Sequence, residues 1–193
     1  MKAAAATSAL EKRIDELERE VNSLRRELDL SRRLLRAASQ INSSLSLSQV
    51  VTRTLDNVQH SISVRRVALF LLEKSTEELL IVGARGLQQS TIHQLRYSEG
   101  EGIVGEAFKG KQLRVVTNAS ENADWLKGLE DDSDGKGDWL VLAPLVADEI
   151  TLGVLCVEGA DGQHTPNEET VIFLETIVSY AAAAIRNARL HED

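Results

Sequence analysis

The sequence contains very few cysteines, prolines and aromatic residues. Its single cysteine, Cys156, cannot form a disulfide within the chain or a cluster of thiolate metal ligands, which fits a reducing cytoplasm. No apolar run approaches the roughly 20 residues that a membrane-spanning helix needs, and the start of the chain does not have the pattern of a signal peptide. We therefore expect a cytoplasmic protein that does not act in a membrane.

An excess of basic residues is also absent. The net charge is −8, and the first 36 residues carry nine basic and seven acidic side chains, which leaves −10 for the rest of the chain. The negative charge of these remaining residues repels the phosphate backbone of a nucleic acid. The composition therefore argues against nucleic acid as a partner.

An apolar repeat with steps of three and four residues occupies the N-terminal segment. Its members are Leu10, Ile14, Leu17, Val21, Leu24 and Leu28. β-Branched residues at the a positions with leucine at the d positions favour a parallel two-stranded coiled coil, and in such a coil Arg13 faces Glu18 and Glu20 faces Arg25. The alternative is a lone amphipathic helix that lies on its own domain. We predict that residues 1–44 form a helix that pairs two copies into a parallel homodimer.

Two nearly continuous apolar runs, Trp139–Val146 and Leu152–Glu158, predict neighbouring antiparallel strands at the centre of a sheet, because a strand covered on both faces does not alternate. Pro144 lacks an N–H group and predicts a bulge or an unpaired position. Residues 45–193 are thus expected to form one α+β domain. Its further strands are predicted at 66–73, 79–85, 96–97 and 113–117, and its helices at 47–63, 88–95, 103–108 and 166–191.

The segment Gly100–Gly105 reads GEGIVG and matches a dinucleotide-binding motif by letter. That motif requires a preceding apolar strand inside a parallel βαβ unit, and the preceding RYSE is not such a strand. The glycines are better explained by a turn and a short helix that ends at Gly110. An anionic ligand at the N-terminus of this helix stays open as an alternative.

Three segments together resemble the GAF domain family. They are GEGIVGEAFKGKQLRVV, APLVADEITLGVLCVEG and EETVIFLETIVSYAAAAIRNARL, within a resemblance that covers residues 34–190. The resemblance implies a central antiparallel sheet of five to six strands, with the first and last helices on one face and with short helices and loops that enclose a small-molecule pocket on the other. It also implies a sensory module of a bacterial signalling protein, one that acts on an attached output domain or a partner protein and is often dimeric through its terminal helices.

Departures from the family pattern narrow its possible activities. The cyclic-nucleotide branch has a spaced Asn-Lys-Phe-Asp-Glu set, and no Lys–Phe pair follows Asn118 at matching positions. A bilin link needs a cysteine near the pocket, whereas Cys156 falls in a central strand. The branch that reduces free methionine sulfoxide uses several cysteines, and one thiol cannot both attack and be resolved by a second. We therefore expect a protein that is not an enzyme, with the ligand unidentified.

Aromatic residues and arginines near the pocket-side segments are the candidate ligand contacts, because such sites combine apolar linings with a few polar groups. The candidates are Tyr97, Phe108, Trp125, Trp139, Arg85 and Arg114, with Arg96 as a further possible anion contact. Ordinary core packing and solvated strand ends explain the same residues, and both explanations stay open.

The sequence gives little support for a metal site or a haem site. Within the acidic stretch Glu121–Asp138, five residues resemble positions of a calcium loop, but the position that requires a bidentate glutamate is Val141. The four histidines lack the spacing of a metal pair on one helix, and His93 is the only one considered as a haem ligand. We predict no metal and leave the cofactor unknown.

Two hypotheses for the function follow. In the first, a ligand binds between the sheet and the segment Tyr97–Trp139 and shifts the terminal helices. In the second, the pocket is vestigial and the chain is a dimerisation or docking scaffold. A scaffold should fill the interior with large apolar side chains, whereas a sensor should leave a cavity with a few polar groups.

Overall fold

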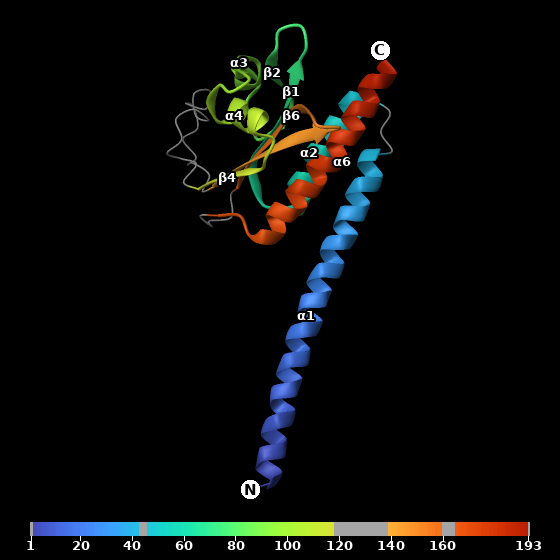
Figure 1. The fold of residues 1–193 in the computed structure, drawn as a ribbon, viewed down its shortest axis with the longest axis vertical. Coiled ribbons are helices and arrows are strands. Elements are labelled where there is room, and N and C mark those ends of the chain that lie inside the picture. Colours follow the sequence, from blue (N-terminus) through green and yellow to red (C-terminus); the bar gives the residue numbers. More distant parts are fainter. Residues whose placement is uncertain (1, 43–45, 118–138, 160–164, 193) are drawn as a thin grey trace. The chain divides into compact units, whose positions relative to one another are not determined.

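The computed structural model describes residues 2–42, 46–117, 139–159 and 165–192. It divides into two compact units, residues 1–36 and residues 37–193. Helix α1 (Lys2–Asn42) forms the first unit and continues into the second (Figure 1).

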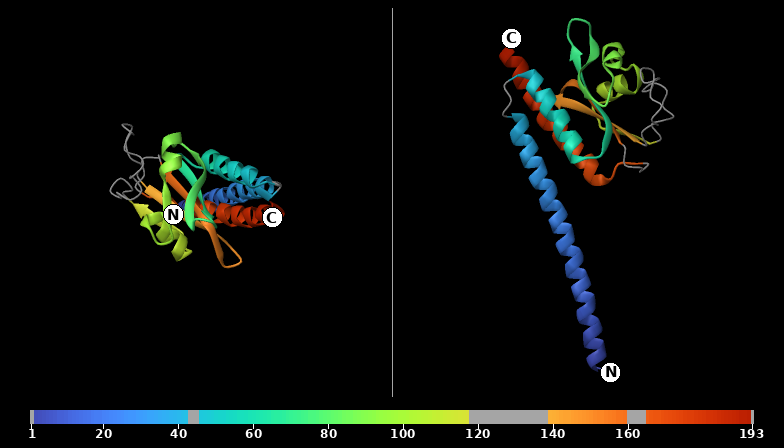
Figure 2. Two further views of the ribbon diagram at one scale, coloured as in Figure 1. Left: turned by 90° about the horizontal axis from the view of Figure 1, so that it is seen from above. Right: turned by 180° about the vertical axis from the view of Figure 1, so that it is seen from behind.

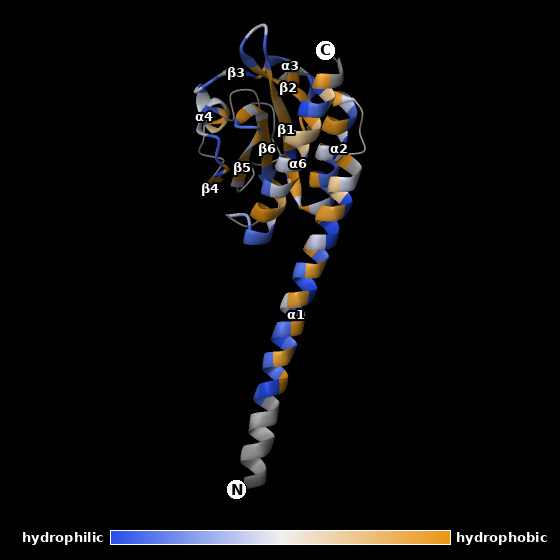
Figure 3. Ribbon diagram, turned by 45° about the vertical axis from the view of Figure 1, so that its right-hand side comes forward, coloured by the Kyte–Doolittle hydropathy of each residue, from blue (hydrophilic) through white to orange (hydrophobic). Residues whose placement is uncertain are grey.

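The apolar repeat of α1 lies on the helix surface. Ile14, Leu17, Val21, Leu24 and Leu28 are 43–57% exposed, and Leu35 is 65% exposed, whereas the side chain of Leu10 lies outside the described residues. Figure 3 shows these hydrophobic positions recurring among hydrophilic ones along α1. Near the end of the helix, Ala37 and Ile41 are buried in the second unit. The two stretches of α1 therefore have different surroundings.

The second unit is built on a six-stranded antiparallel sheet with the order β3-β2-β1-β6-β5-β4. Its strands are β1 (Val64–Glu73), β2 (Glu78–Arg85), β3 (Arg96–Ser98), β4 (Arg114–Thr117), β5 (Trp139–Ala147) and β6 (Ile150–Gly159). The two apolar runs form β5 and β6, which pair directly, and β6 lies between β1 and β5. The prediction of a central hairpin buried on both faces is confirmed.

Among the described residues, four helices cover the two faces of the sheet. They are α2 (Leu47–Ser61), α3 (Gln89–Gln94), α4 (Gly102–Gly110) and α6 (Glu168–Glu192). Helices α2 and α6 lie together on one face, and α3 and α4 lie on the other (Figures 1 and 2). This is the predicted α+β arrangement.

Helix α2 packs closely on β2 because a glycine faces it. A Cβ atom on Gly83 would lie 2.6 Å from Cγ1 of Val51 and 2.9 Å from Cδ1 of Leu55. Both of these α2 residues are buried. The absence of a side chain at Gly83 thus sets the distance between α2 and the sheet.

The start of α6 and the end of α4 are capped by other residues than the sequence indicates. Helix α6 begins at Glu168 rather than at Pro166, because the side chain of Asn167 accepts a hydrogen bond from the Thr170 N–H (2.8 Å) and is the N-cap. Helix α4 does run to Gly110, but the residue in the left-handed conformation after it is Lys111, with φ 54°.

Pro144 lies where the ladder between β4 and β5 has already stopped. The last pair of that ladder is Arg114 with Leu142, and β5 continues alone on this side. A bulge follows between Leu145 and Val146 in the pairing with β6. Pro144 pairs with Val154 of β6, and its predicted unpaired position is met on the β4 side among the described residues.

Helix α6 is long and apolar enough to pass a composition test for a membrane span over Glu168–Leu190. Half of that stretch is buried inside the unit, where α6 contacts β5 and α2. Its apolar character is therefore explained by two packing partners, which also accounts for the two apolar stripes in its sequence.

Candidate functional site

On the face of the sheet covered by α3 and α4, where the pocket was predicted, the described side chains form one buried apolar cluster. Its large members are Phe70, Leu79, Leu95, Tyr97, Val104, Phe108, Leu140 and Leu142. The rings of Phe70 and Tyr97 meet edge to face, with centroids 5.7 Å apart. These side chains occupy the space between the sheet and α4 as a core would.

The four predicted aromatic contacts divide between the two faces. Tyr97 and Phe108 lie together in the apolar cluster, each 7% exposed. Trp139 is 1% exposed but neighbours Leu140 in the strand, so alternation directs it to the opposite face, where its ring lies against Gly159. Trp125 falls outside the described residues.

The predicted arginines form ion pairs with neighbouring carboxylates. Arg85 binds Asp56 of α2 at 2.8 Å, which ties β2 to the helix face opposite the cluster. Arg114 binds Glu106 of α4 at 2.6 Å, near solvent. Arg96 lies 3.5 Å from Glu78 on the adjacent strand. Each arginine thus has a structural partner, and the three do not converge on one point.

A buried ion pair that sequence reasoning missed lies on the cluster side of the sheet. Arg66 of β1 donates from Nη1 to both carboxylate oxygens of Glu158 of β6, at 2.8 and 3.1 Å, and each side chain is only 3% exposed. Strand alternation places Arg66 on the face of Ala68, and Glu158 on the face of Cys156. The available signal was a charged residue at the end of each of two apolar runs.

The glycine-rich segment before α4 forms a closed turn. Gly100 N–H donates to the carbonyl of Gly105 (3.0 Å), and Glu101 N–H donates to the carbonyl of Ser98 (3.0 Å). The Glu101 carboxylate in turn accepts from Ser98 N–H at 2.8 Å. A Cβ atom on Gly105 would lie 2.2 Å from the Ser98 carbonyl oxygen. The glycines therefore allow backbone segments to approach, as the structural explanation predicted.

Cys156 lies in the apolar cluster and is fully buried. Burial raises the pKa of its thiol far above the ordinary value, so the sulfur stays protonated and weakly nucleophilic. Among the described residues, no three histidine, cysteine or acidic side chains gather as metal ligands would. The calcium-like stretch from Glu130 to Asp138 is outside the described residues.

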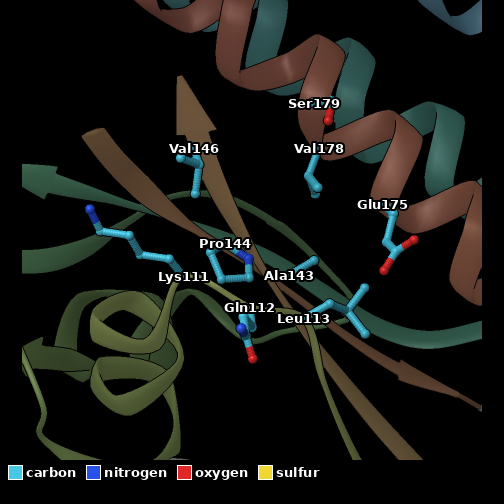
Figure 4. Close-up of a pocket in the computed structure, with 9 residues that line it drawn as sticks. All are labelled: Lys111, Gln112, Leu113, Ala143, Pro144, Val146, Glu175, Val178 and Ser179. Atoms are coloured by element: carbon cyan, nitrogen blue, oxygen red, sulfur yellow. The ribbon is translucent and has the colours of Figure 1, made fainter. Parts of the chain in front are cut away.

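A groove opens on the other face, beside the free side of β5. It has a volume of about 480 Å³ and lies between α6, β5 and the connection from α4 to β4 (Figure 4). We call this hollow the edge groove, and its lining consists of Lys111, Gln112, Leu113, Ala143, Pro144, Val146, Glu175, Val178 and Ser179. Sequence reasoning did not find it, because three distant segments build it.

The comparisons with known proteins agree with this fold. The model of the GAF domain family matches residues 44–186, and the chain belongs to that family.

Regulatory proteins are among the relatives in sequence. The chain is 28% identical over 164 residues to a Nif-specific regulatory protein of Herbaspirillum seropedicae, an alignment that covers 79% of this chain and 30% of the relative. It is 29% identical over 150 residues to a Nif-specific regulatory protein of Azospirillum brasilense, with 76% and 24% covered. The chain thus spans 24–30% of the length of these curated relatives.

Solved GAF structures share the fold at low identity. The GAF domain of a phosphoenolpyruvate-protein phosphotransferase from Coxiella burnetii superposes with a TM-score of 0.75 at 19% identity, over 86% of this chain and 97% of that one. A free methionine-R-sulfoxide reductase from Neisseria meningitidis gives 0.67 at 16% identity, over 82% and 89%. The present sequence has a single cysteine, and it is buried.

Proposed function

We propose that this chain is the cytoplasmic sensory module of a longer signalling protein. It binds a small molecule and passes the change to an output domain or partner through paired terminal helices, and it carries out no catalysis itself. Membership of the GAF family supports this proposal, as does similarity to one part of longer regulatory proteins. The observation that carries it is the exposed apolar repeat of α1, because a second copy of the same helix would cover it.

Transmission requires that α6 be connected to the sheet at defined points. Arg189 donates from Nη2 to the carbonyl of Leu72 at the end of β1 (3.1 Å). Arg186 pairs with Asp148 in the turn between β5 and β6. A ligand moves such an assembly only when it binds two arrangements with different affinity. These contacts are the ones that change if α6 shifts against the sheet.

Tyr97 and Phe108 remain our candidates for ligand contact on the α4 side. Both lie in the filled apolar cluster, so a ligand enters there only when α4 or β3 moves outward. Such an opening would expose apolar area, for which the ligand must compensate by its own burial.

A second candidate function is a dimerisation or docking scaffold that binds no ligand. The specific observation in its favour is the filled cluster, in which Phe70, Tyr97, Phe108 and Leu142 are each at most 7% exposed. Native mass spectrometry and thermal shift against a panel of metabolites and nucleotides separate the two functions. A co-purified or saturably stabilising ligand supports the sensor. The scaffold is favoured when the dimer forms and the full panel leaves the melting temperature unchanged.

The dimer is tested by a cysteine placed at an a position. Ile14→Cys should form an intermolecular disulfide under mild oxidation, because the a positions of parallel, in-register helices face each other. Arg19→Cys, at an outward f position, is the matched control and should stay reduced. Buried Cys156 does not interfere, since its thiol is inaccessible. Equal cross-linking of the two variants, or none in either, contradicts the parallel coiled coil.

A further inference from the structure

We propose that the edge groove binds a small apolar zwitterion, namely a free apolar amino acid or a dipeptide of two such residues. The inference rests on the proposed sensory function and gives its ligand a site and a chemical class. It places that ligand on the opposite face of the sheet from the predicted pocket, directly against α6 (Figure 4).

The floor of the edge groove is apolar. Leu113, Ala143, Pro144, Val146 and Val178 contribute it, from the strand β5, the segment before β4 and the helix α6. The volume of about 480 Å³ lies within the range of small-molecule sites, which is roughly 300–1,000 Å³. An aliphatic side chain buried on this floor gains the usual hydrophobic contribution.

One cation and one anion stand on opposite sides of this floor. Figure 4 shows Lys111 and Glu175 separated by Ala143 and Pro144, with Lys111 on the α4–β4 connection and Glu175 on α6. The ammonium of Lys111 donates to the carbonyl of Glu149 at 2.7 Å, which holds it at the hairpin end of the groove. An ammonium has three donors, so this contact leaves N–H groups for a ligand carboxylate.

The facing wall is suited to an ammonium group. The carboxylate of Glu175 and the hydroxyl of Ser179 line it, one helical turn apart on α6. Within the described part of the chain, Glu175 has no ion-pair or hydrogen-bond partner. A ligand ammonium would therefore give Glu175 a charged partner that the described residues do not provide.

The two charges together select for a ligand that carries both signs. A ligand that is only an anion meets the like charge of Glu175, and one that is only a cation meets that of Lys111. A zwitterion orients its carboxylate to Lys111 and its ammonium to Glu175, so each charge faces its opposite. The overall acidity of the chain, with a net charge of −8, further disfavours anions without a compensating positive group.

Three exposed apolar residues lie close in sequence to residues that line the groove or that contact Lys111. Val115 and Ile172 are each 41% exposed and Ile150 is 63% exposed. Val115 lies two residues after Leu113, Ile172 lies one turn before Glu175 on α6, and Ile150 adjoins Glu149. This apolar surround would hold the second side chain of a dipeptide.

Occupation of the edge groove has a direct consequence for α6. The ligand would contact Val178 and Ser179 of α6 on one side and Pro144 of β5 on the other. It would thereby add a bridge between the helix and the sheet, at a position two turns before the Arg186–Asp148 pair. Binding therefore favours the arrangement in which α6 is docked.

The first experiment compares matched ligands with the full chain at neutral pH. L-Leucine and L-leucyl-L-leucine are titrated by calorimetry and thermal shift, beside isocaproate, which lacks the ammonium, and isoamylamine, which lacks the carboxylate. At least one zwitterion should bind saturably and raise the melting temperature by mass action. Each single-charge analogue should bind at least about tenfold more weakly than leucine or not at all. Equal binding of leucine and isocaproate overturns the selection by two charges.

The second experiment exchanges the two charges. Lys111→Glu and Glu175→Lys should each weaken zwitterion binding by about tenfold or more, because each leaves two like charges around the ligand. The double variant should recover most of the affinity, with the ligand reversed. Ser179→Trp should abolish binding by filling the groove from an exposed helix position. Lys109→Glu and Glu168→Lys change the same charges on exposed residues outside the groove and should leave binding unchanged.

The outcomes separate this inference from the function on which it rests. Zwitterion binding that is lost in the groove variants and kept in the controls supports the edge groove. If a ligand of any class stabilises the protein and the groove variants bind it normally, the sensor stands and the edge groove is wrong. If neither the zwitterions nor the metabolite and nucleotide panel bind, both proposals fail together.

Discussion

At the scale of single residues, the described glycine that leaves least room for a side chain is Gly159, which lies against Trp139. A Cβ atom on Gly159 would lie 1.9 Å from Cε2 and 2.2 Å from Cζ2 of the indole. Trp139 is 1% exposed, so its rigid ring has no space into which to move. The absence of a side chain at Gly159, at the end of β6, therefore leaves the space that the Trp139 ring occupies.

Gly159→Ala should lower the free energy of unfolding by about 1–3 kcal/mol, as overpacking of a core does. Urea denaturation followed by tryptophan fluorescence measures both the stability and the displacement of the indole. Gly110→Ala is the matched control, because a Cβ atom there meets nothing within 4 Å, and it should be neutral or slightly stabilising. Equal midpoints for the two variants would show that the ring accommodates the methyl group.

The face that each β5 residue takes was not predictable from the sequence. A strand buried on both sides has no apolar–polar alternation, so the pattern establishes burial but not phase. Trp139 was assigned to the pocket side, whereas neighbouring Leu140 is the residue that joins the apolar cluster. Tyr97 is the buried residue of its short strand, which alternates exposed, buried, exposed, and it joins the apolar cluster.

At the scale of elements, the Arg66–Glu158 pair links the two strands at the middle of the sheet. Both partners are almost fully buried, so the removal of one leaves the other charge uncompensated. Their replacement by two apolar residues leaves no charge behind and is close to neutral in other proteins.

Arg66→Met should therefore destabilise the protein by about 3–5 kcal/mol, and the double variant Arg66→Met/Glu158→Met by much less. Denaturant titration of the four proteins of this cycle gives the coupling energy directly. The exposed pair Arg114–Glu106, whose side chains are 45% and 54% exposed, is the control, and Arg114→Met should change stability by less than about 1 kcal/mol. Additive losses in the buried cycle would contradict a direct interaction.

Most elements were predictable because their signals are local. Apolar runs placed β5 and β6 to within two residues at each end, and α2 starts at the predicted residue, where the Ser46 hydroxyl accepts from Gln49 N–H. The start of α6 was misplaced because Thr165 and Asn167 are both competent caps, two residues apart. Only the bond from Thr170 N–H to Asn167 decides between them.

At the scale of the whole molecule, Cys156 links stability to alkaline pH. Burial raises the pKa of its thiol, so the folded state keeps the proton while the unfolded thiol ionises above about pH 8.5. Below that pH, the Cys156 thiol is protonated in both states and does not change the stability of the folded protein. As the pH rises further, the unfolding equilibrium shifts towards the unfolded state by up to about tenfold per pH unit.

Wild type should therefore lose stability faster than Cys156→Ala between about pH 9 and pH 10, since alanine has no proton to release. Other groups titrate in this range, but they contribute equally to both proteins and cancel in the difference. The measurement is the urea midpoint of each protein at a series of pH values. Parallel curves would mean that the thiol is accessible to base in the folded state.

The candidate sites show where prediction from sequence ends. The apolar cluster of the α4 side was foreseen as a location, because covered strands need a second layer. The edge groove was not, since residues 111–113, 143–146 and 175–179 come together only in the folded unit. The pairing of Arg66 with Glu158 likewise depends on the register between β1 and β6, which no local pattern specifies.

The strand order also has a consequence for biosynthesis. Val67 of β1 pairs with Val157 of β6. The middle of the sheet therefore cannot form until about 90 residues after Val67 have been translated. At roughly 5–20 residues per second this delay is about 5–20 s. Helix α1 leaves the ribosome before any of these strands. Two chains that are being translated from one messenger RNA and that meet through α1 would therefore pair before the core of either chain is complete.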